Sequence, residues 1–362
     1  MREAFQTKAR RFPKQWEDCS PEWMTSVIAN HHPGAQVQDV TVIGRDDGTN
    51  RRARLGLTYA SGSGPPTVFL KASDAAHRLV HLRNGNLFGE ARLFATRVPL
   101  AVEHPLAYRA IVRRAHMDFL IVMEDLTHRG ADPRDATRPM TVDQVARGLR
   151  GLASLHNQYR GLSGKTHPKL GWVKTWKPTE GWQVGLKKRI PTGLERGAAE
   201  LPEEVTKRSA EEIVRIWAQY VTTLSRGPMT LLHGDAHIGN TYVLPDDNVG
   251  FLDWQVVRRG EWSQDVGYFL ISALKEDDRR SSEADLVEEY RKALDGPSDQ
   301  IPSASEAWLR YRATPAYGLA IWLSTLGTDG WQPREVSMVL AQRYASAFVE
   351  LETMSALEAL DA

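Results

Sequence analysis

The chain has 362 residues, of which 41% are hydrophobic and 25% are charged, so it can bury a sizeable core and is long enough for two domains or one large two-lobed unit. Lys and Arg (46) nearly balance Asp and Glu (45), so no net field attracts nucleic acid and we expect no nucleic-acid partner. The single cysteine, Cys19, excludes an intramolecular disulfide and a cysteine-based zinc site, and no apolar run reaches the roughly 20 residues that span a membrane, so we expect a cytoplasmic protein without a membrane partner.

The first part of the chain is predicted to form a short helix and then strands. Ser20 followed by proline is typical of a helix start, and we expect this helix to continue through Ile28. Patterns of apolar residues predict three strands over residues 37–43, 52–59 and 67–71. Because turn-forming residues separate these strands, we expect a three-stranded antiparallel meander.

A helix around residues 87–98 and two strands over residues 108–114 and 119–123 complete the strand-rich part. The apolar spacing then becomes mostly helical, which predicts a boundary between domains 1–124 and 125–362. The spacing predicts three helices in the second domain, over residues 141–159, 210–225 and 308–326.

One motif dominates the second domain: His233-Gly234-Asp235, followed by Asn240 and then by Asp253. A strand, a turn and a return strand are predicted between Asn240 and Asp253, which would bring these two side chains to neighbouring strand ends. Amide and carboxylate oxygens suit Mg²⁺ beside nucleotide phosphates. The pattern therefore predicts a kinase-type site in which Asp235 takes the proton of an attacking hydroxyl while Asn240 and Asp253 hold magnesium.

The motif around Asp235 and Asn240, with Asp253 between a leucine and a tryptophan, resembles those of the aminoglycoside phosphotransferase and choline kinase superfamily, small-molecule relatives of protein kinases. The resemblance extends from about Ser20 to beyond Leu270. It implies an α+β, two-lobed protein-kinase-like fold. The small antiparallel-sheet N-lobe would bind nucleotide and carry a helical N-terminal extension, and the larger, mostly helical C-lobe would hold the catalytic loop and the acceptor pocket.

The resemblance also implies roles for single residues. Lys71, at the end of the third predicted strand, would bind phosphate and form an ion pair with Glu90. His233 would support the catalytic loop, and Asp265 would steady it through backbone hydrogen bonds. Taken alone, three of the predicted site residues have simpler interpretations: Lys71 as a solvated strand end, Glu90 as a surface glutamate and Asp235 as a turn residue.

Two further segments are candidates for nucleotide binding. The segment that ends at Leu126 looks like the hinge that meets adenine, especially in the ecdysteroid-kinase-like branch, so the Glu124 carbonyl and the Leu126 amide would contact the base. Gly48, Thr49 and Asn50 lie in the first turn of the meander, where backbone amides could reach phosphates. An ordinary hairpin turn is the alternative, because the chain has neither a Walker nor a Rossmann glycine pattern.

The acceptor is predicted to be small, because the short segment between Asp253 and Asp265 cannot form the long activation segment of protein kinases. Aromatic residues of the second domain are more typical of core, but any that line a cleft favour an apolar or ring-bearing alcohol. They are Trp262, Tyr268, Trp308, Tyr311, Tyr317, Trp322 and Trp331. A polycationic acceptor would require clustered carboxylates. The acidic residues near the end are instead expected to be spread along a solvated helix: Glu350, Glu352, Glu358 and Asp361.

Three functions compete at this point. The leading one is a phosphotransferase that uses ATP or GTP with Mg²⁺ to phosphorylate a small hydroxylated acceptor. A protein kinase and a non-catalytic nucleotide-binding module are the alternatives. His233 and His237 do not suggest a metal pair, because no third nitrogen or sulfur ligand follows at a recognisable spacing. The oligomeric state has no signal in the sequence.

Overall fold

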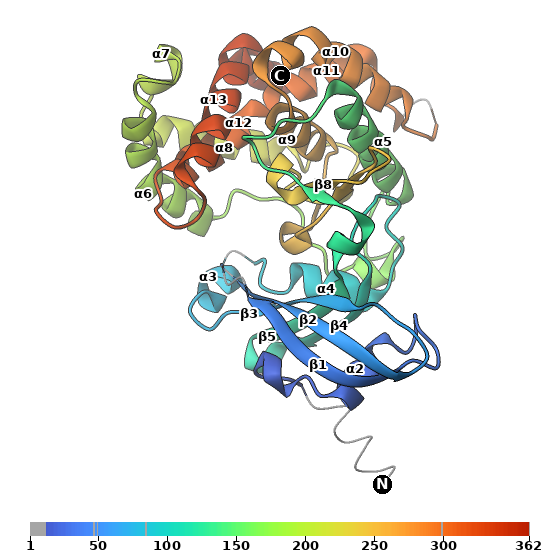
Figure 1. The fold of residues 1–362 in the computed structure, drawn as a ribbon. Helices are drawn as coiled ribbons and strands as arrows, with labels where there is room; N and C mark the ends of the chain where they lie inside the picture. The colour runs from blue at the N-terminus through green and yellow to red at the C-terminus, as the bar shows by residue number, and fades with distance from the viewer. Residues whose placement is uncertain (1–11, 46–47, 49, 84, 298–299, 362) are drawn as a thin grey trace. The chain divides into compact units, whose positions relative to one another are not determined.

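The computed structural model describes residues 12–45, 48, 50–83, 85–297 and 300–361, and the chain divides into two compact units. The first unit contains the described residues up to Val98 together with Pro105–Gly130, so it continues past Glu124. The second contains Pro99–His104 and the described residues from Ala131 onward. Figure 1 follows the chain through both units.

The first unit is built on a five-stranded antiparallel sheet. Its strands are β1 (Gln36–Arg45), β2 (Asn50–Ser61), β3 (Thr67–Ser73), β4 (Ala107–Arg113) and β5 (Asp118–Glu124). Its helices are α2 (Pro21–Ile28), α3 (Arg78–Arg83) and α4 (Gly89–Thr96). The strand order is β1-β2-β3-β5-β4, so the predicted meander of the first three strands is confirmed and β5 extends it from β3.

Alternation along the strands gives this sheet two apolar faces, each covered by a helix (Figure 1). Helix α2 begins as predicted at Ser20, whose hydroxyl accepts a hydrogen bond from the Trp23 amide at 3.2 Å. Trp23 packs in one cluster with Leu120 of β5, whereas the next residue, Ile121, packs in the opposite cluster with Ala91 of α4. The two faces therefore receive alternate residues of the same strand.

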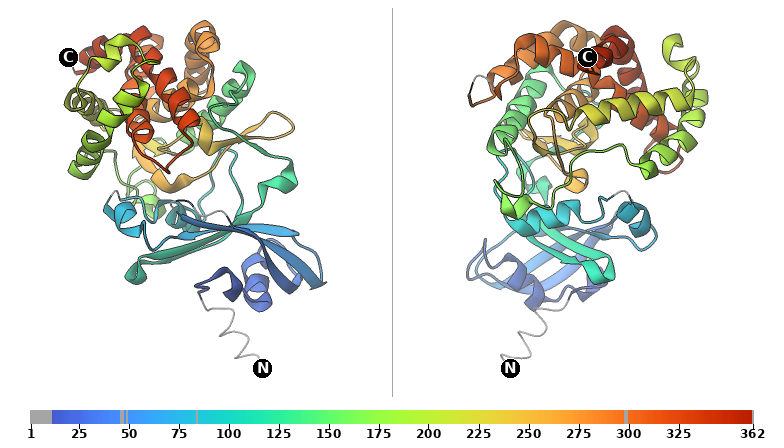
Figure 2. Two further views of the ribbon diagram at one scale, coloured as in Figure 1. Left: turned by 60° about the vertical axis from the view of Figure 1, so that its left-hand side comes forward. Right: turned by 180° about the vertical axis from the view of Figure 1, so that it is seen from behind.

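The second unit is mostly helical, and Figure 2 shows its helices from two further sides. The helices are α5 (Val142–Gln158), α6 (Glu180–Gly197), α7 (Glu203–Thr206), α8 (Ala210–Thr223), α9 (Ser263–Ala273), α10 (Glu276–Lys292), α11 (Ala304–Ala313), α12 (Pro315–Leu326), α13 (Arg334–Glu350) and α14 (Thr353–Asp361). Five short strands are β6 (Asp132–Pro133), β7 (Thr230–Leu232), β8 (Thr241–Val243), β9 (Val249–Phe251) and β10 (Arg258–Gly260). Helix α9 is buried along its whole length and packs against α5, α10, α11, α12 and α13, so it forms the centre of the unit.

The helices predicted over residues 141–159 and 210–225 are confirmed as α5 and α8, but the single helix predicted over residues 308–326 is wrong. It consists of α11 and α12, which meet at Thr314. Pro315 causes the break, because proline lacks the amide proton of a continuing helix and clashes with the preceding turn. Among the described helices, none is long and apolar enough to cross a membrane.

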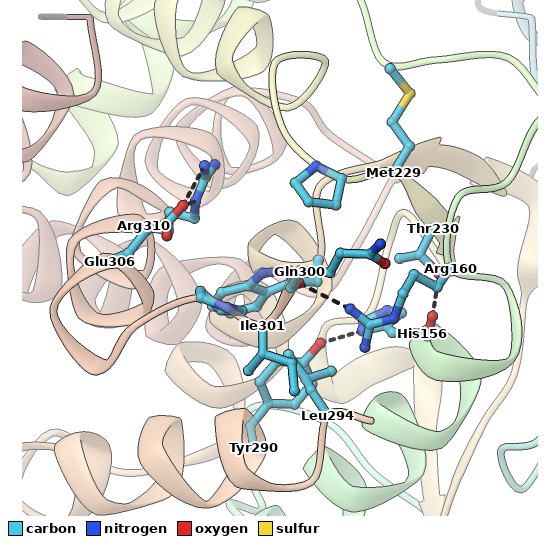
Figure 3. A pocket seen from close by; sticks show the side chains of 13 residues that line it. His156, Arg160, Met229, Thr230, Tyr290, Leu294, Gln300, Ile301, Glu306 and Arg310 are labelled. Carbon is cyan, nitrogen blue, oxygen red and sulfur yellow. Dashed lines mark hydrogen bonds and ion pairs between the residues drawn. The ribbon is translucent and has the colours of Figure 1, made fainter. Parts of the chain in front are cut away.

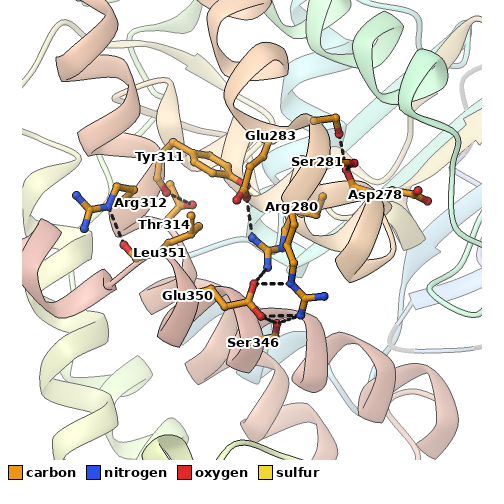
Figure 4. A network of polar contacts seen from close by, with 12 residues as sticks. Asp278, Arg280, Ser281, Glu283, Tyr311, Arg312, Thr314, Ser346, Glu350 and Leu351 are labelled. Carbon is orange, nitrogen blue, oxygen red and sulfur yellow. Dashed lines mark hydrogen bonds and ion pairs between the residues drawn. The ribbon is translucent and has the colours of Figure 1, made fainter.

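Three of the four acidic residues near the end of the chain, Glu350, Glu352 and Asp361, form ion pairs with arginines, whereas Glu358 is exposed as predicted. Glu350 accepts hydrogen bonds from Arg280 of α10 at 2.6 and 3.0 Å and from Arg279, as Figure 4 shows for this network. Although partial burial opposes ionisation, these contacts and one from Ser346 lower the pKa of Glu350 to about 2. Glu350 therefore fastens α13 to α10 and is already neutralised by protein cations.

Candidate active site

Lys71 and Glu90 form a buried ion pair in the first unit. Because side chains alternate along β3, Lys71 lies on the sheet face that α4 covers, whereas Leu70 packs on the other face. The Lys71 Nζ atom is 2.7 Å from Glu90 Oε2, and the two residues are only 5% and 4% exposed. Buried charges are costly unless they are paired, so this contact holds the lysine ammonium in a defined place.

The predicted hinge covers the end of β5 and the two residues after it. The Glu124 amide donates to the Leu106 carbonyl at 2.9 Å, and Asp125 after it accepts a hydrogen bond from Thr67 at 2.6 Å and pairs with Arg54 at 2.8 Å. Burial opposes ionisation of Asp125, but these contacts keep the pKa of its carboxyl below the ordinary value. The side chain of Asp125 thus fixes the segment, and the adenine contacts of Glu124 and Leu126 stay predictions.

The glycine turn has the local hydrogen bond of a hairpin. The Gly48 amide donates to the Asn50 carbonyl at 3.0 Å, and a Cβ atom at Gly48 would lie 2.9 Å from a terminal nitrogen of Arg52. Thr49 lies outside the described residues. The Gly48 amide is therefore used within the turn, and phosphate binding by these three residues stays a prediction.

In the second unit, β7 leads into the loop that carries Asp235. Gly234 has a φ of 83°, and a Cβ atom there would lie 2.2 Å from the Val256 carbonyl oxygen, so a larger residue does not fit. The fully buried Asp265, in the first turn of α9, accepts hydrogen bonds from the backbone amides of His233 at 2.6 Å and Gly234 at 2.9 Å. The carboxylate of Asp265 therefore fixes the two residues before Asp235.

His233 connects the loop to the residue before Asp253. Its Nε2 atom is 3.0 Å from the Leu252 carbonyl oxygen, which can only accept a hydrogen bond, so the proton of the neutral ring is on Nε2. The Nδ1 atom then accepts from the Asp235 amide at 3.3 Å. The buried His233 imidazole thus connects the backbone of Asp235 to that of Leu252, the residue before Asp253.

Asn240 and Asp253 lie at adjacent ends of the β8–β9 hairpin, where the Leu252 amide donates to the Asn240 carbonyl at 2.9 Å. The side-chain Nδ2 of Asn240 donates to the Asp235 carbonyl oxygen at 2.9 Å and to its Oδ2 at 3.2 Å. This orientation turns the amide oxygen of Asn240 away from Asp235. Asp253 itself has φ 61° and ψ 64°, a left-handed conformation that costs energy in a non-glycine residue and is often kept at functional sites.

The electrostatics single out Asp235. Burial and the negative charge of Asp253 raise the pKa of Asp235 to about 7, with a smaller contribution from Asp265 and against a hydrogen bond from Asn240. A carboxyl with a pKa near neutrality can both take up and release a proton at physiological pH. Among the residues that the sequence predicts for the site, Asp235 thus has a pKa suited to proton exchange, and its role as the base stays a prediction.

The side-chain oxygens of Asn240 and Asp253 suit a hard cation only if other ligands complete its coordination. Among the described residues, no group of three or more histidine, cysteine, aspartate or glutamate side chains could hold a metal ion. One amide oxygen from Asn240 and one carboxylate from Asp253 fit Mg²⁺ if nucleotide phosphates and water supply the other ligands, as is usual for this ion.

His237 belongs to an aromatic core beside the loop. Its Nδ1 atom accepts from the Gly239 amide at 3.1 Å, and its ring packs edge-on against Trp322 and Tyr268 with centroid separations of 5.0 and 5.7 Å. Burial and the neighbouring His233 lower the pKa of His237 to about 3, so the ring is neutral and caps the loop. The aromatic residues around it are buried, which agrees with the core interpretation.

Sequence reasoning missed a third histidine. His156, near the end of α5, has its Nδ1 2.7 Å from the Tyr290 hydroxyl and its Nε2 3.4 Å from Asp265 Oδ2. Since a carboxylate only accepts, the proton lies on Nε2 and the tyrosine donates to Nδ1. No local spacing could reveal this contact, because its three members come from different helices.

Comparison with known proteins gives consistent findings. A family model described as a phosphotransferase enzyme family matches residues 57–304. The structure resembles a putative aminoglycoside phosphotransferase from Ralstonia eutropha JMP134, with 13% identity, a TM-score of 0.54, and coverage of 92% of this chain and 98% of that chain. It also resembles spectinomycin phosphotransferase APH(9)-Ia, solved with ADP and spectinomycin, with 12% identity, a TM-score of 0.52, and coverage of 94% and 100%. A search of curated proteins found no match. The predicted fold class, an antiparallel-sheet unit followed by a helical one, is confirmed.

Proposed function

Because this chain belongs to the phosphotransferase enzyme family, we propose that it transfers the γ-phosphate of ATP or GTP to a hydroxyl group of a small molecule. The observation that carries the proposal is the joint placement of Asp235, Asn240 and Asp253. A hydrogen bond between the Asn240 and Asp235 side chains and the bridge through His233 hold the three together. Phosphoryl transfer depends mainly on such positioning and on neutralising charge.

In this mechanism Asp235 accepts the proton of the acceptor hydroxyl while that oxygen forms a bond to the γ-phosphorus. The bond between the γ-phosphorus and the β–γ bridging oxygen breaks, and the nucleoside diphosphate leaves with the electron pair. Asn240 and Asp253 would hold Mg²⁺, which when bound neutralises phosphate charge. Lys71, fixed by Glu90, would neutralise further phosphate charge.

The proton acceptor must be ionised to work. In the metal-free protein the charge of Asp253 helps to keep Asp235 protonated up to about pH 7. A cation bound to Asp253 would offset its negative charge, lower the pKa of Asp235 and so favour the ionised, active form of Asp235.

A small acceptor is supported by the chain between Asp253 and Asp265. It contains only the 3-10 helix Trp254–Val256, strand β10 and the start of α9, and β10 pairs with β7 within the same unit. No segment of this kind could present a peptide as a protein-kinase activation segment does. The similar spectinomycin phosphotransferase was solved with ADP and spectinomycin, and a nucleotide with a small acceptor is the pair of substrates that we propose here.

The test is a screen for nucleotide consumption with ATP and with GTP, in the presence of Mg²⁺ and a panel of hydroxylated metabolites and antibiotics. A productive acceptor is confirmed by the phosphomonoester signal of its product in ³¹P NMR. Asp235→Asn should lower turnover by on the order of 10²–10⁴ with little change in nucleotide affinity, because it removes the base and not the binding groups. Wild-type turnover in this variant contradicts the mechanism. Autophosphorylation and peptide arrays test the protein-kinase alternative, and nucleotide binding without turnover of any acceptor would favour the non-catalytic module.

A further inference from the structure

A cavity lies within the helical unit, and neither Asp235, Asn240 nor Asp253 lines it. It has a volume of about 190 Å³. One water molecule occupies roughly 30 Å³ in the liquid, so the cavity is several times larger than a single water site. Its walls come from the end of α5, from β7 and its preceding loop, and from α10, α11 and residues 294 and 300–302 between them (Figure 3). A molecule of the size of one substituted ring fits this volume.

One side of the cavity is apolar and flat. The rings of Trp262 and Tyr290 lie with centroids 4.9 Å apart and planes inclined by 31°, and Leu294 and Ile301 line the cavity beside them. Aromatic and aliphatic walls of this kind favour an apolar body, preferably a planar one that packs against the rings.

The other side carries a cation, the Arg160 guanidinium, whose partners among the described residues are neutral. Arg160 donates to Asn157 Oδ1 at 2.9 Å and to the Gln300 carbonyl at 3.1 Å, both of which are neutral acceptors. Within the described ranges, no carboxylate oxygen forms an ion pair with this guanidinium, whereas Arg310 across the cavity pairs with Glu306 at 2.9 Å. Arg160 therefore retains unused donors of the kind that bind carboxylate or phosphate.

We propose that this cavity binds a small molecule with a ring-sized apolar body and one carboxylate or phosphate group, the oxyanion at Arg160 and the body against Tyr290 and Trp262. Among the residues that the structure describes, the charged side chains that line the cavity are Arg160, Arg310 and Glu306, so an anionic ligand also balances their charge.

The cavity adjoins the support of the catalytic loop. Tyr290 and His156 both line it, and they form the chain of contacts that ends at Asp265, which holds the amides of His233 and Gly234. A ligand that fixes Tyr290 restricts His156 and, through it, Asp265. The site is thus a regulatory site in our proposal, and this regulatory part alone rests on the proposed function.

Binding is tested on the full chain with benzoate, phenyl phosphate and the uncharged benzyl alcohol, followed by ligand-observed NMR and calorimetry. We expect saturable binding of at least one anion, at least tenfold tighter than that of benzyl alcohol. Arg160→Gln should weaken the anion at least tenfold and leave benzyl alcohol unchanged. Ile301→Trp should fill the cavity and abolish binding of all probes. Arg150→Gln, an exposed change on α5 at an ion pair with Glu289, is the matched control and should bind as the wild type does.

Two results overturn the site: no saturable binding of either anion, or anion binding that persists in both Arg160→Gln and Ile301→Trp. The relative affinity of benzoate and phenyl phosphate decides between a carboxylate and a phosphate ligand. Neither readout uses catalysis, so failure of the proposed function leaves them intact. For the regulatory part, saturation with the bound anion should change nucleotide turnover at least twofold in the wild type and not in Arg160→Gln. Unchanged turnover in a protein that binds the anion refutes it.

Discussion

Replacing Asp235 by asparagine should stabilise the protein in a pH-dependent way. The pKa of Asp235 rises from 3.8 to about 7 on folding, which corresponds to on the order of 4 kcal/mol of free energy at pH values above both. The folded state holds a proton that the unfolded chain releases, so the stability that this group contributes is present at low pH and is lost as the pH rises towards 7. The asparagine variant cannot ionise and escapes this loss. It keeps an amide oxygen for the hydrogen bond from Asn240.

The difference in melting temperature between the variant and the wild type should therefore widen from pH 5 to pH 8. Since part of the loss occurs below pH 5, only about 3 kcal/mol of it falls between pH 5 and pH 8. For a unit of this size, 1 kcal/mol corresponds to about 2–4 °C, so the upper limit of the widening is roughly 10 °C. Tryptophan fluorescence suits the measurement, because all tryptophans except Trp16 and Trp23 lie in the second unit. The melts are recorded with a chelator and without nucleotide.

Asp285→Asn is the matched control, since it removes an exposed carboxylate on α10 and should give a difference that does not change with pH. Adding Mg²⁺ should narrow the gap between Asp235→Asn and the wild type, because the ion offsets the charge of Asp253. A gap that stays constant from pH 5 to pH 8 would refute the argument that Asp235 is destabilised by its own ionisation.

Three further predictions concern other parts of the proposed site. Lys71→Met should weaken nucleotide binding at least tenfold, as measured by calorimetry. Glu90→Gln should also weaken nucleotide binding, because it leaves the buried Lys71 ammonium without its counter-charge. Unchanged nucleotide affinity in both variants would exclude a phosphate-binding role for Lys71. Gly234→Ala should lower the melting temperature by several degrees and turnover at least 10²-fold, because its Cβ would meet the Val256 carbonyl, and a variant that melts and turns over as the wild type does would contradict the geometry. Removing divalent cations with EDTA should abolish phosphoryl transfer in a coupled assay and added Mg²⁺ should restore it, whereas activity that survives EDTA would exclude the metal role of Asp253.

The strands and the best helices could be predicted because their signal is local. The period-two pattern that placed the first three strands depends on which face each residue buries, and the sheet of the first unit has two distinct apolar faces. Helix α10 gave almost no signal, because its buried residues Leu286, Val287 and Tyr290 are diluted by charged neighbours. The break at Pro315 was overlooked because apolar spacing continues across it.

The part of the candidate site that lies on one loop and the hairpin after it could be predicted from the sequence. Asp235, Asn240 and Asp253 are close in sequence, so a loop and two short strands suffice to bring them together. The contact of His156 with Asp265 depends on the packing of α5 against α9, which no local pattern encodes. The raised pKa of Asp235 likewise arises from burial. The assignment to the ecdysteroid-kinase-like branch and the adenine contacts stay predictions.

The short segment Pro99–His104 attaches the N-terminal part of the chain to the second unit. It belongs to the second unit, although the residues on both sides of it belong to the first. Glu103 is fixed there by the Phe251 amide and the Tyr242 hydroxyl, and the Ala101 amide by Gln158. A protease that cuts only after Gly130 would therefore leave two fragments that stay associated, since the N-terminal fragment retains its hold on the helical unit. Split-protein reporters and fragment complementation could use this position.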